Sequence, residues 1–194
     1  MKRVYFYAVI LFVVIFGANF VVLSSANAGD DDPLVIIDWG NGIEGDVTLI
    51  GYKNWSYATG VSLGVYNEAS PLTPQASGLS FFDGLTVTKY ANIDSTQLAF
   101  CCARAELIPE IKILSLRSSK ELTPLWEMIL TNNIISRIAS GINETDGLLM
   151  EAIDVNPQMI EWRYYKYDPK TGQPLGSEWT IWDRGANTVT KGVD

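Results

Sequence analysis

The sequence predicts an all-β domain with one short helix near the middle of the chain. Short apolar or aromatic runs alternate with glycine, proline, asparagine and aspartate, as in strands joined by turns. One stretch, residues 94–103, instead has the spacing of a helix. The sequence has no histidine, which excludes Ser-His-Asp catalysis and histidine-based zinc sites.

The first 28 residues are typical of a secretory signal peptide. Lys2 and Arg3 form a basic start, residues 4–23 carry no charge, and Ala26-Asn27-Ala28 is a small-x-small cleavage site. We expect cleavage after Ala28 and export across the inner membrane. Because an apolar run of about 20 residues can also cross a bilayer, the alternative is an uncleaved anchor, which would be the chain's only contact with a membrane.

The exported chain is strongly acidic. Residues 1–28 contain two basic residues and no acidic one, so 12 of the 14 basic residues remain beside 22 acidic ones, a net charge of −10. This balance argues against a nucleic-acid partner, whose phosphates bind Lys and Arg, and against anionic membrane surfaces. Three aspartates begin the exported chain, and we expect residues 29–33 to form a solvated acidic arm.

The strand candidates follow one another through residues 34–183, the expected folded domain. They are residues 34–39, strands within 43–57, then 79–90, 110–117, 126–130, 134–139, 148–155, 159–167 and 178–183. The sequence Asp168-Pro169-Lys170-Thr171-Gly172 predicts a turn between the last two strands. Residues 57–78, rich in Gly, Ser, Thr and Pro, are expected to form a long functional loop, and residues 184–194 a C-terminal tail.

The helix has a recognisable start and one apolar face. Asp94 is expected to be the N-cap, with Gln97 completing a capping box and Ile93 packing on Leu98 as a hydrophobic staple. The apolar face consists of Leu98, Cys101 and Cys102, and we expect both thiols to be buried and reduced. On this interpretation Asp94→Ala costs about 1 kcal/mol and Leu98→Ala about 2–5 kcal/mol.

The remaining residues suggest no catalytic chemistry. No short motif indicates a paired-carboxylate glycosidase or a phosphate-binding loop, so we expect no catalytic, cofactor-binding or metal-binding residues. Aromatic side chains could form a sugar-stacking face, although core and subunit contacts are the other interpretation. These residues are Trp55, Tyr57, Trp162, Tyr164, Tyr165, Tyr167, Trp179 and Trp182.

Two blocks of the sequence resemble the haemolysin-coregulated protein (Hcp) family, the tube-forming component of type VI secretion. The first block is Asn41-Gly42-Ile43-Glu44-Gly45-Asp46, followed by Ile50, Asn54-Trp55-Ser56 and Gly60. The second is Leu85-Thr86-Val87-Thr88-Lys89-Tyr90, followed by Asp94, Leu98, Ala99, Cys101-Cys102, Pro109-Glu110 and Lys112. The similarity extends over residues 34–183.

This resemblance implies a β-barrel of two packed sheets with one short flanking helix. Subunits of the family assemble as a hexameric ring, and rings stack into a tube that carries effector proteins; the family has no catalytic residues to transfer. Residues 57–78 match the position of the family's protruding loop. The signal peptide departs from the family, whose tube is built in the cytoplasm, so we expect an exported relative in the periplasm or outside a bacterial cell. The alternative is a monomeric binding module whose aromatic face takes a carbohydrate or protein ligand.

Overall fold

The computed structural model describes residues 33–69, 76–117 and 122–194. The expected signal peptide, and the expected acidic arm apart from Pro33, lie outside the described residues. Among the residues that are described, no helix is long and apolar enough to cross a membrane.

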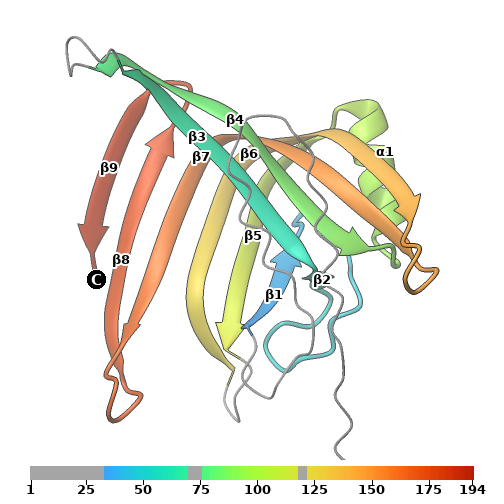
Figure 1. Cartoon of the computed structure of the whole chain (residues 1–194), viewed down its shortest axis with the longest axis horizontal. Helices are drawn as coiled ribbons and strands as arrows, with labels where there is room; N and C mark the ends of the chain where they lie inside the picture. The colour runs from blue at the N-terminus through green and yellow to red at the C-terminus, as the bar shows by residue number, and fades with distance from the viewer. Residues whose placement is uncertain (1–32, 70–75, 118–121) are drawn as a thin grey trace, which may run out of the picture.

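The described chain contains nine strands and one helix, which confirms the all-β class (Figure 1). The elements are β1 (Pro33–Asp38), β2 (Ser56–Ala58), β3 (Gly60–Ala69), β4 (Ala76–Tyr90), α1 (Ser95–Arg104), β5 (Leu107–Arg117), β6 (Thr123–Ile142), β7 (Leu149–Tyr167), β8 (Pro174–Asp183) and β9 (Thr188–Val193). The helix lies within one residue of its predicted position. β9 falls inside residues 184–194, where a C-terminal tail is expected.

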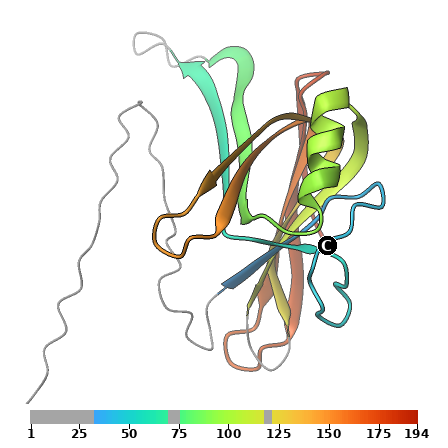
Figure 2. The ribbon, with the colours of Figure 1, turned by 90° about the vertical axis from the view of Figure 1, so that its right-hand side faces the viewer.

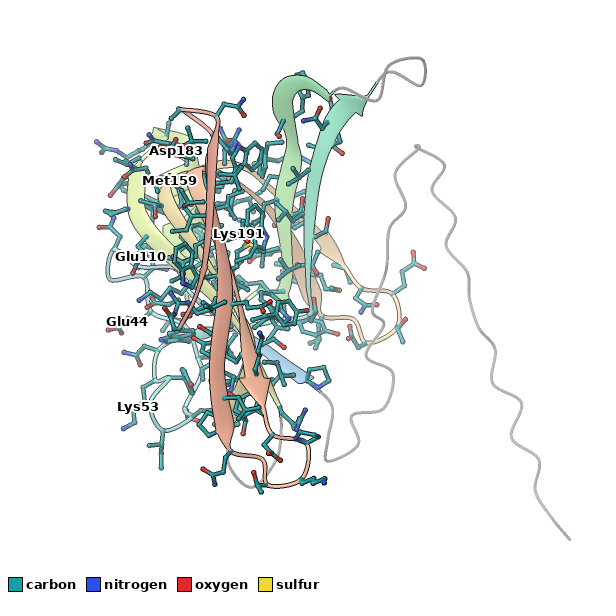
Figure 3. The ribbon with its side chains drawn as sticks, turned by 90° about the vertical axis from the view of Figure 1, so that its left-hand side faces the viewer. Glu44, Lys53, Glu110, Met159, Asp183 and Lys191 are labelled. Carbon is teal, nitrogen blue, oxygen red and sulfur yellow. The ribbon has the colours of Figure 1, made fainter. Side chains whose placement is uncertain are left out.

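All strand pairs are antiparallel, and one strand path runs β2-β1-β5-β6-β7-β4-β3. β7 bends this path, because its first half pairs with β4 while its second half pairs with β8, which in turn pairs with β9. The β3–β4 hairpin therefore lies as a separate layer beside the sheet of β6 to β9, at the left of the view in Figure 2. Side chains from both layers fill part of the space between them (Figure 3).

The two packed layers do not close into a complete barrel. The strand path ends at β2 and at β3, which do not pair with each other among the described residues. Only Thr59 separates these two strands in the chain, and its N–H donates a hydrogen bond of 2.8 Å to Thr88 O on β4. The covalent link between β2 and β3 thus joins the two ends of the curled sheet.

Two long strands replace four predicted short ones. Residues 126–130 and 134–139 both belong to β6, and residues 148–155, apart from Leu148, and 159–167 both belong to β7. The two strands pair along nearly their whole length, with one irregularity between Ile135 and Arg137. The strands continue through the polar residues that were expected to interrupt them, because these residues are paired between β6 and β7.

The expected long loop over residues 57–78 is wrong for most of its described part, because β3 occupies residues 60–69. Its glycines do not prevent pairing, since Val61 lies opposite Val87 and Leu63 opposite Leu85 on β4. Gly64 marks a register shift in the ladder, which is a common place for glycine in a strand. The remainder of this prediction, residues 70–75, lies outside the described residues.

The strands expected within residues 43–57 are mostly absent from the described structure, because only Ser56 and Tyr57 belong to β2. The preceding residues form an irregular loop that folds back on itself. Gly45 N–H donates to Asn54 O at 2.7 Å, and Val47 N–H donates to Trp55 O at 2.8 Å. A side chain at Gly45 would collide with the Trp55 carbonyl. The close contact therefore explains why a glycine occupies this position of the first motif block.

The predicted turn before β8 is confirmed. The Asp168 carboxylate accepts hydrogen bonds from the backbone N–H groups of Lys170 (2.7 Å) and Thr171 (2.9 Å). Gly172 closes the turn with a φ of 71°, a conformation that glycine adopts at little cost. These backbone contacts lower the pKa of Asp168.

The main core lies between helix α1 and the inner faces of β4 to β7. Leu98 is fully buried and joins a cluster with residues such as Ile111, Leu130 and Ile153. Cys101 is also buried, whereas Cys102 is partly buried and packs at the edge of the same cluster. The predicted apolar face of the helix is therefore confirmed for Leu98 and Cys101, while Cys102 lies at its margin.

Leu98→Ala is expected to destabilise the protein by about 2–5 kcal/mol, because it removes a fully buried side chain and leaves a cavity. Phe100→Ala on the same helix is the matched control, since Phe100 is 52% exposed and should change stability far less. Urea unfolding followed by tryptophan fluorescence measures both. Equal losses would show that Leu98 does not face the core.

The two cysteines should react at different rates. Both are free thiols, and burial raises the pKa of Cys101, with Glu106 adding to the shift. A low thiolate fraction and a buried sulfur both slow alkylation. In the Cys102→Ser variant the remaining thiol should stay unlabelled in buffer and react fully in denaturant. Rapid labelling of that variant in its folded state would contradict the packing of α1.

Candidate functional site

A buried charged cluster lies where helix α1 meets the sheet. Lys89 Nζ is 2.6 Å from Asp94 Oδ1 and 3.0 Å from Glu151 Oε2, and none of the three side chains is more than 7% exposed. Nζ also contacts Tyr90 O, Asn92 Oδ1 and Ser95 Oγ, each at 3.1 Å. The ammonium thus links β4, the start of α1 and β7.

The cluster extends to β1 and β2 through Asp94. The second carboxylate oxygen of Asp94 accepts a short hydrogen bond from Ser56 Oγ on β2. Ser56 Oγ in turn accepts a 3.0 Å hydrogen bond from Trp39 Nε1, at the end of β1. On the other side, Ser95 Oγ donates to Glu151 Oε2 at 2.7 Å. Every buried charge in this cluster therefore has a charged or hydrogen-bonding partner, as burial of charge requires.

The prediction that the Asp94 side chain caps helix α1 is wrong, although Asp94 does occupy the N-cap position. Asp94 is the residue before the first turn, but its side chain makes no hydrogen bond to the helix backbone. The carboxylate binds Lys89 and Ser56 instead, because a buried ammonium offers a stronger partner than a backbone N–H. The hydrophobic staple is also wrong, since Ile93 is 70% exposed while Leu98 is fully buried.

The cluster has the properties of a structural anchor. Two carboxylates face a single ammonium, and all three groups are withdrawn from water. Desolvating such ions costs several kcal/mol each, and only complete pairing offsets that cost. A side chain that is buried and already paired is not available to a substrate, so the geometry holds the helix on the sheet.

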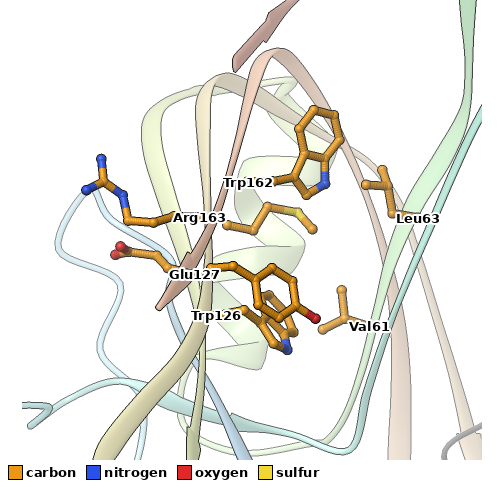
Figure 4. Close-up of a pocket in the computed structure, with 8 residues that line it drawn as sticks. Val61, Leu63, Trp126, Glu127, Trp162 and Arg163 are labelled. Atoms are coloured by element: carbon orange, nitrogen blue, oxygen red, sulfur yellow. The ribbon is translucent and has the colours of Figure 1, made fainter. Parts of the chain in front are cut away.

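A second feature is an open apolar cleft of about 220 Å³ between β3 and the β6–β7 pair (Figure 4). The side chains that face the space come from three strands: Val61, Leu63, Trp126, Met128, Trp162 and Tyr164. Glu127 and Arg163 also line the cleft, but their side chains point away from it (Figure 4). The cleft can therefore hold apolar or aromatic groups and offers little charge.

Strand register shows where the cover over the sheet ends. Leu130, Ile160, Trp182 and Val189 lie in one row across β6, β7, β8 and β9. Along this row the exposed fraction is 0%, 0%, 3% and 61%. The covering layer thus protects β6, β7 and β8 in this row, while β9 extends beyond it.

The eight predicted aromatic residues do not form one face. Trp162 and Tyr164 reach the cleft, whereas Tyr165 and Tyr167 lie on the opposite face of β7 and donate to Glu127 Oε2 (2.8 Å) and Pro124 O (2.7 Å). Burial and the contact with Glu127 raise the pKa of Tyr165. A single sugar-stacking surface made by the eight residues is therefore not present.

The other four aromatic residues lie apart from the cleft. Trp182 is buried, and Trp55 packs edge-to-face on Tyr52 with ring centroids 5.3 Å apart. Trp179 Nε1 donates to Asp194 Oδ1 at 3.3 Å, and Tyr57 is partly exposed on β2. Sequence reasoning missed Trp126 as a cleft residue; its position opposite Tyr164 depends on the β6–β7 register.

Several large apolar side chains are exposed on the single chain. They include Ile50, Val65, Tyr66, Ile93, Ile142, Leu148, Leu149, Tyr164, Leu175, Val189 and Val193. Among the described residues, no group of three or more His, Cys, Asp or Glu side chains is placed to hold a metal ion. These features define an all-β protein with a sealed polar anchor, an open apolar cleft and several exposed large apolar side chains.

The chain belongs to the Hcp family of type VI secretion proteins. The family model described as "Type VI secretion system effector, Hcp" matches residues 37–164, which include both motif blocks, so the resemblance seen in the sequence is confirmed. No curated protein sequence matches the chain.

Solved structures show the same fold at low sequence identity. A type six secretion system protein superposes with a TM-score of 0.73 and 19% identity, over 81% of this chain and 99% of the other. Hcp1 from Salmonella typhimurium gives 0.63 and 13%, over 81% and 99%. A type VI secretion system effector from Yersinia pestis gives 0.60 and 16%, over 77% and 98%. The described fold is thus that of Hcp proteins.

Asp94→Ala is expected to cost roughly 2–3 kcal/mol, because it removes one of the two carboxylates that face Lys89 and leaves the buried Ser56 hydroxyl without its acceptor. This exceeds the value of about 1 kcal/mol for a lost cap. Glu110→Ala is the matched control: it removes one partner of the partly exposed Glu110–Lys112 pair and should cost less than about 1 kcal/mol. Urea unfolding gives both values. A loss of stability in Asp94→Ala close to that of the control would contradict the structural role of the Lys89 cluster.

Proposed function

We propose that the protein is an exported structural subunit of the Hcp family that assembles into a ring, hexameric as the resemblance implies, and has no catalysis of its own. The observation that carries this proposal is the exposed apolar surface of the single chain, present on a fold of the Hcp type. Exposed apolar patches of a soluble protein mark contacts with other chains.

Two free strand edges support self-association. Among the described residues β3 pairs with β4 alone and β9 with β8 alone. Both edge strands expose apolar side chains, Val65 and Tyr66 on β3 and Val189 and Val193 on β9. Unprotected edges with apolar side chains favour pairing with another chain, and soluble proteins usually cover them.

The same features support a structural role. The buried ions around Lys89 are fully paired, and the side chains that face the cleft are aliphatic or aromatic. Neither feature offers an acid and a base that a substrate can reach, which proton-transfer catalysis needs. In this proposal the ring acts by enclosing or carrying secreted effector proteins.

The N-terminal sequence supports export. Its basic start, apolar run and Ala26-Asn27-Ala28 site are those of a secretory signal, so the ring would form in the periplasm or outside the cell. This location distinguishes the proposed protein from a tube subunit that assembles in the cytoplasm.

Size-exclusion chromatography with light scattering, on the protein expressed with its own N-terminus, tests the ring. At concentrations on the order of 10 μM, where interfaces of ordinary affinity are occupied, we expect a closed assembly of six copies. Negative-stain electron micrographs of the same fraction should show rings. A strictly monomeric species at this concentration would overturn the proposal.

A further inference from the structure

We propose that the end of the β6–β7 hairpin of one copy docks in the open cleft of the next copy. The inference rests on the ring proposed above and assigns the contact that builds it. For this purpose the hairpin end is residues 142–149, which join β6 to β7. The cleft is the space between Val61, Leu63, Trp126, Met128, Trp162 and Tyr164.

The hairpin end is an apolar projection. Ile142, Leu148 and Leu149 are 71%, 54% and 45% exposed. Ile142 lies directly opposite Leu149, so both side chains are on one face of the strand pair. Along β7 the same face continues with Glu151 and Ile153, which are buried. The hairpin end therefore extends a core-forming face into solvent without a covering element from its own chain.

The hairpin end is also held in one conformation. Asn143 N–H donates to Leu148 O at 2.8 Å, and Leu148 N–H donates to Asp146 Oδ1 at 3.0 Å. Tyr90 Oη donates to Asp146 Oδ2 at 2.6 Å and thereby ties the turn to β4. A fixed projection loses little conformational entropy on binding, which suits it to fill a cleft.

Charge favours the same pairing. The turn carries Glu144 and Asp146, both exposed. At the cleft, Lys191 on β9 lies in one row with Thr180, Trp162 and Met128, so its side chain is on the cleft face of the sheet. Within the described part of the chain, neither Glu144 nor Lys191 takes part in an ion pair. On the same face Glu178, opposite Tyr164, is paired with Lys166, so Lys191 leaves a net positive charge beside the apolar cleft. An acidic apolar projection matches such a surface.

The position of the two surfaces identifies the occupant as a second copy. The β6–β7 turn lies at one side of the molecule, while β8 and β9 lie at the other (Figure 1). The cleft lies on β3 and on the far ends of β6 and β7, where Met128 and Trp162 are 14 and 13 residues along their strands from Ile142 and Leu149. The hairpin end of a chain therefore does not reach its own cleft. A contact between two different patches of one protein is heterologous, and repetition of such a contact gives a ring when the rotation closes.

Two variants test the two surfaces of this contact one at a time. Tyr164→Asp puts a charge in the cleft and leaves the hairpin end intact, whereas Ile142→Asp charges the hairpin end and leaves the cleft intact. Both positions are more than 60% exposed, so the fold should tolerate the change. Leu175→Asp, at a 62% exposed position near the start of β8 that does not line the cleft, is the matched control.

Each variant alone should dissociate at concentrations on the order of 30-fold higher than the unmodified protein does, the loss expected for a central interface residue. A 1:1 mixture should give a heterodimer and no ring, because one intact cleft meets one intact hairpin end. Leu175→Asp should keep the ring. Native mass spectrometry identifies each species, and circular dichroism confirms that each variant is folded.

The outcomes separate the two proposals. If the unmodified protein is monomeric, both the ring and this contact are excluded. If it forms rings and either variant still does so, the contact is wrong while the ring stands. A mixture that stays monomeric also overturns the contact. As an independent check, Lys191→Glu and Glu144→Lys should each weaken the ring about 2- to 5-fold, the effect of losing an exposed charge pair. The two changes combined in one chain should restore the ring. Failure to restore it would contradict the pairing of these charges.

Discussion

The contact of Lys89 with Asp94 and Glu151 is the constraint on which the arrangement of the helix and the sheet depends. The three side chains come from β4, from the residue before α1 and from β7, and Ser56 and Trp39 connect them to β2 and β1. Buried ions tolerate little displacement, because the two carboxylates would be left uncompensated in a medium of low dielectric constant if they lost contact with Lys89. The cluster therefore specifies the position of α1 more narrowly than the apolar contacts of Leu98 could, since apolar packing has no direction.

The fixed position of the helix determines what remains uncovered. Helix α1 and the β3–β4 layer bury the inner face of β6 and β7 around Leu130 and Ile160, but β9 extends past this cover. The long β6–β7 hairpin extends past it in the other direction, as far as Ile142 and Leu149. The sheet is thus longer than the elements that cover it. An uncovered length of sheet is costly for a monomer but gives a subunit two apolar surfaces for its neighbours.

The sequence allowed the fold to be predicted wherever local pattern and tertiary contact agree. The helical spacing of residues 94–103 located α1, and the Asp168 turn located the β7–β8 hairpin, because interactions within a few residues decide both. Other features depend on distant partners. Asp94 has the sequence context of a cap, yet its carboxylate binds Lys89 instead of the helix backbone. The glycines of residues 60–69 suggest a loop, yet pairing with β4 keeps them in a strand. The cleft was not predictable, because the register of β6 on β7 brings Trp126 beside Tyr164.

The anchor adjoins the hairpin end along β7 and one wall of the cleft across β4 and β3, which joins folding to assembly. Glu151 lies two residues beyond Leu149 on the same face of β7, so the ion cluster fixes the base of the hairpin end. Lys89 lies two residues beyond Val87, which pairs with Val61 in the wall of the cleft. A chain that loses the cluster would therefore present both docking surfaces in altered positions. Conversely, a neighbour that binds only the native surfaces would stabilise the folded chain by mass action, so the cost of burying these charges would be offset in part by the assembly that they make possible.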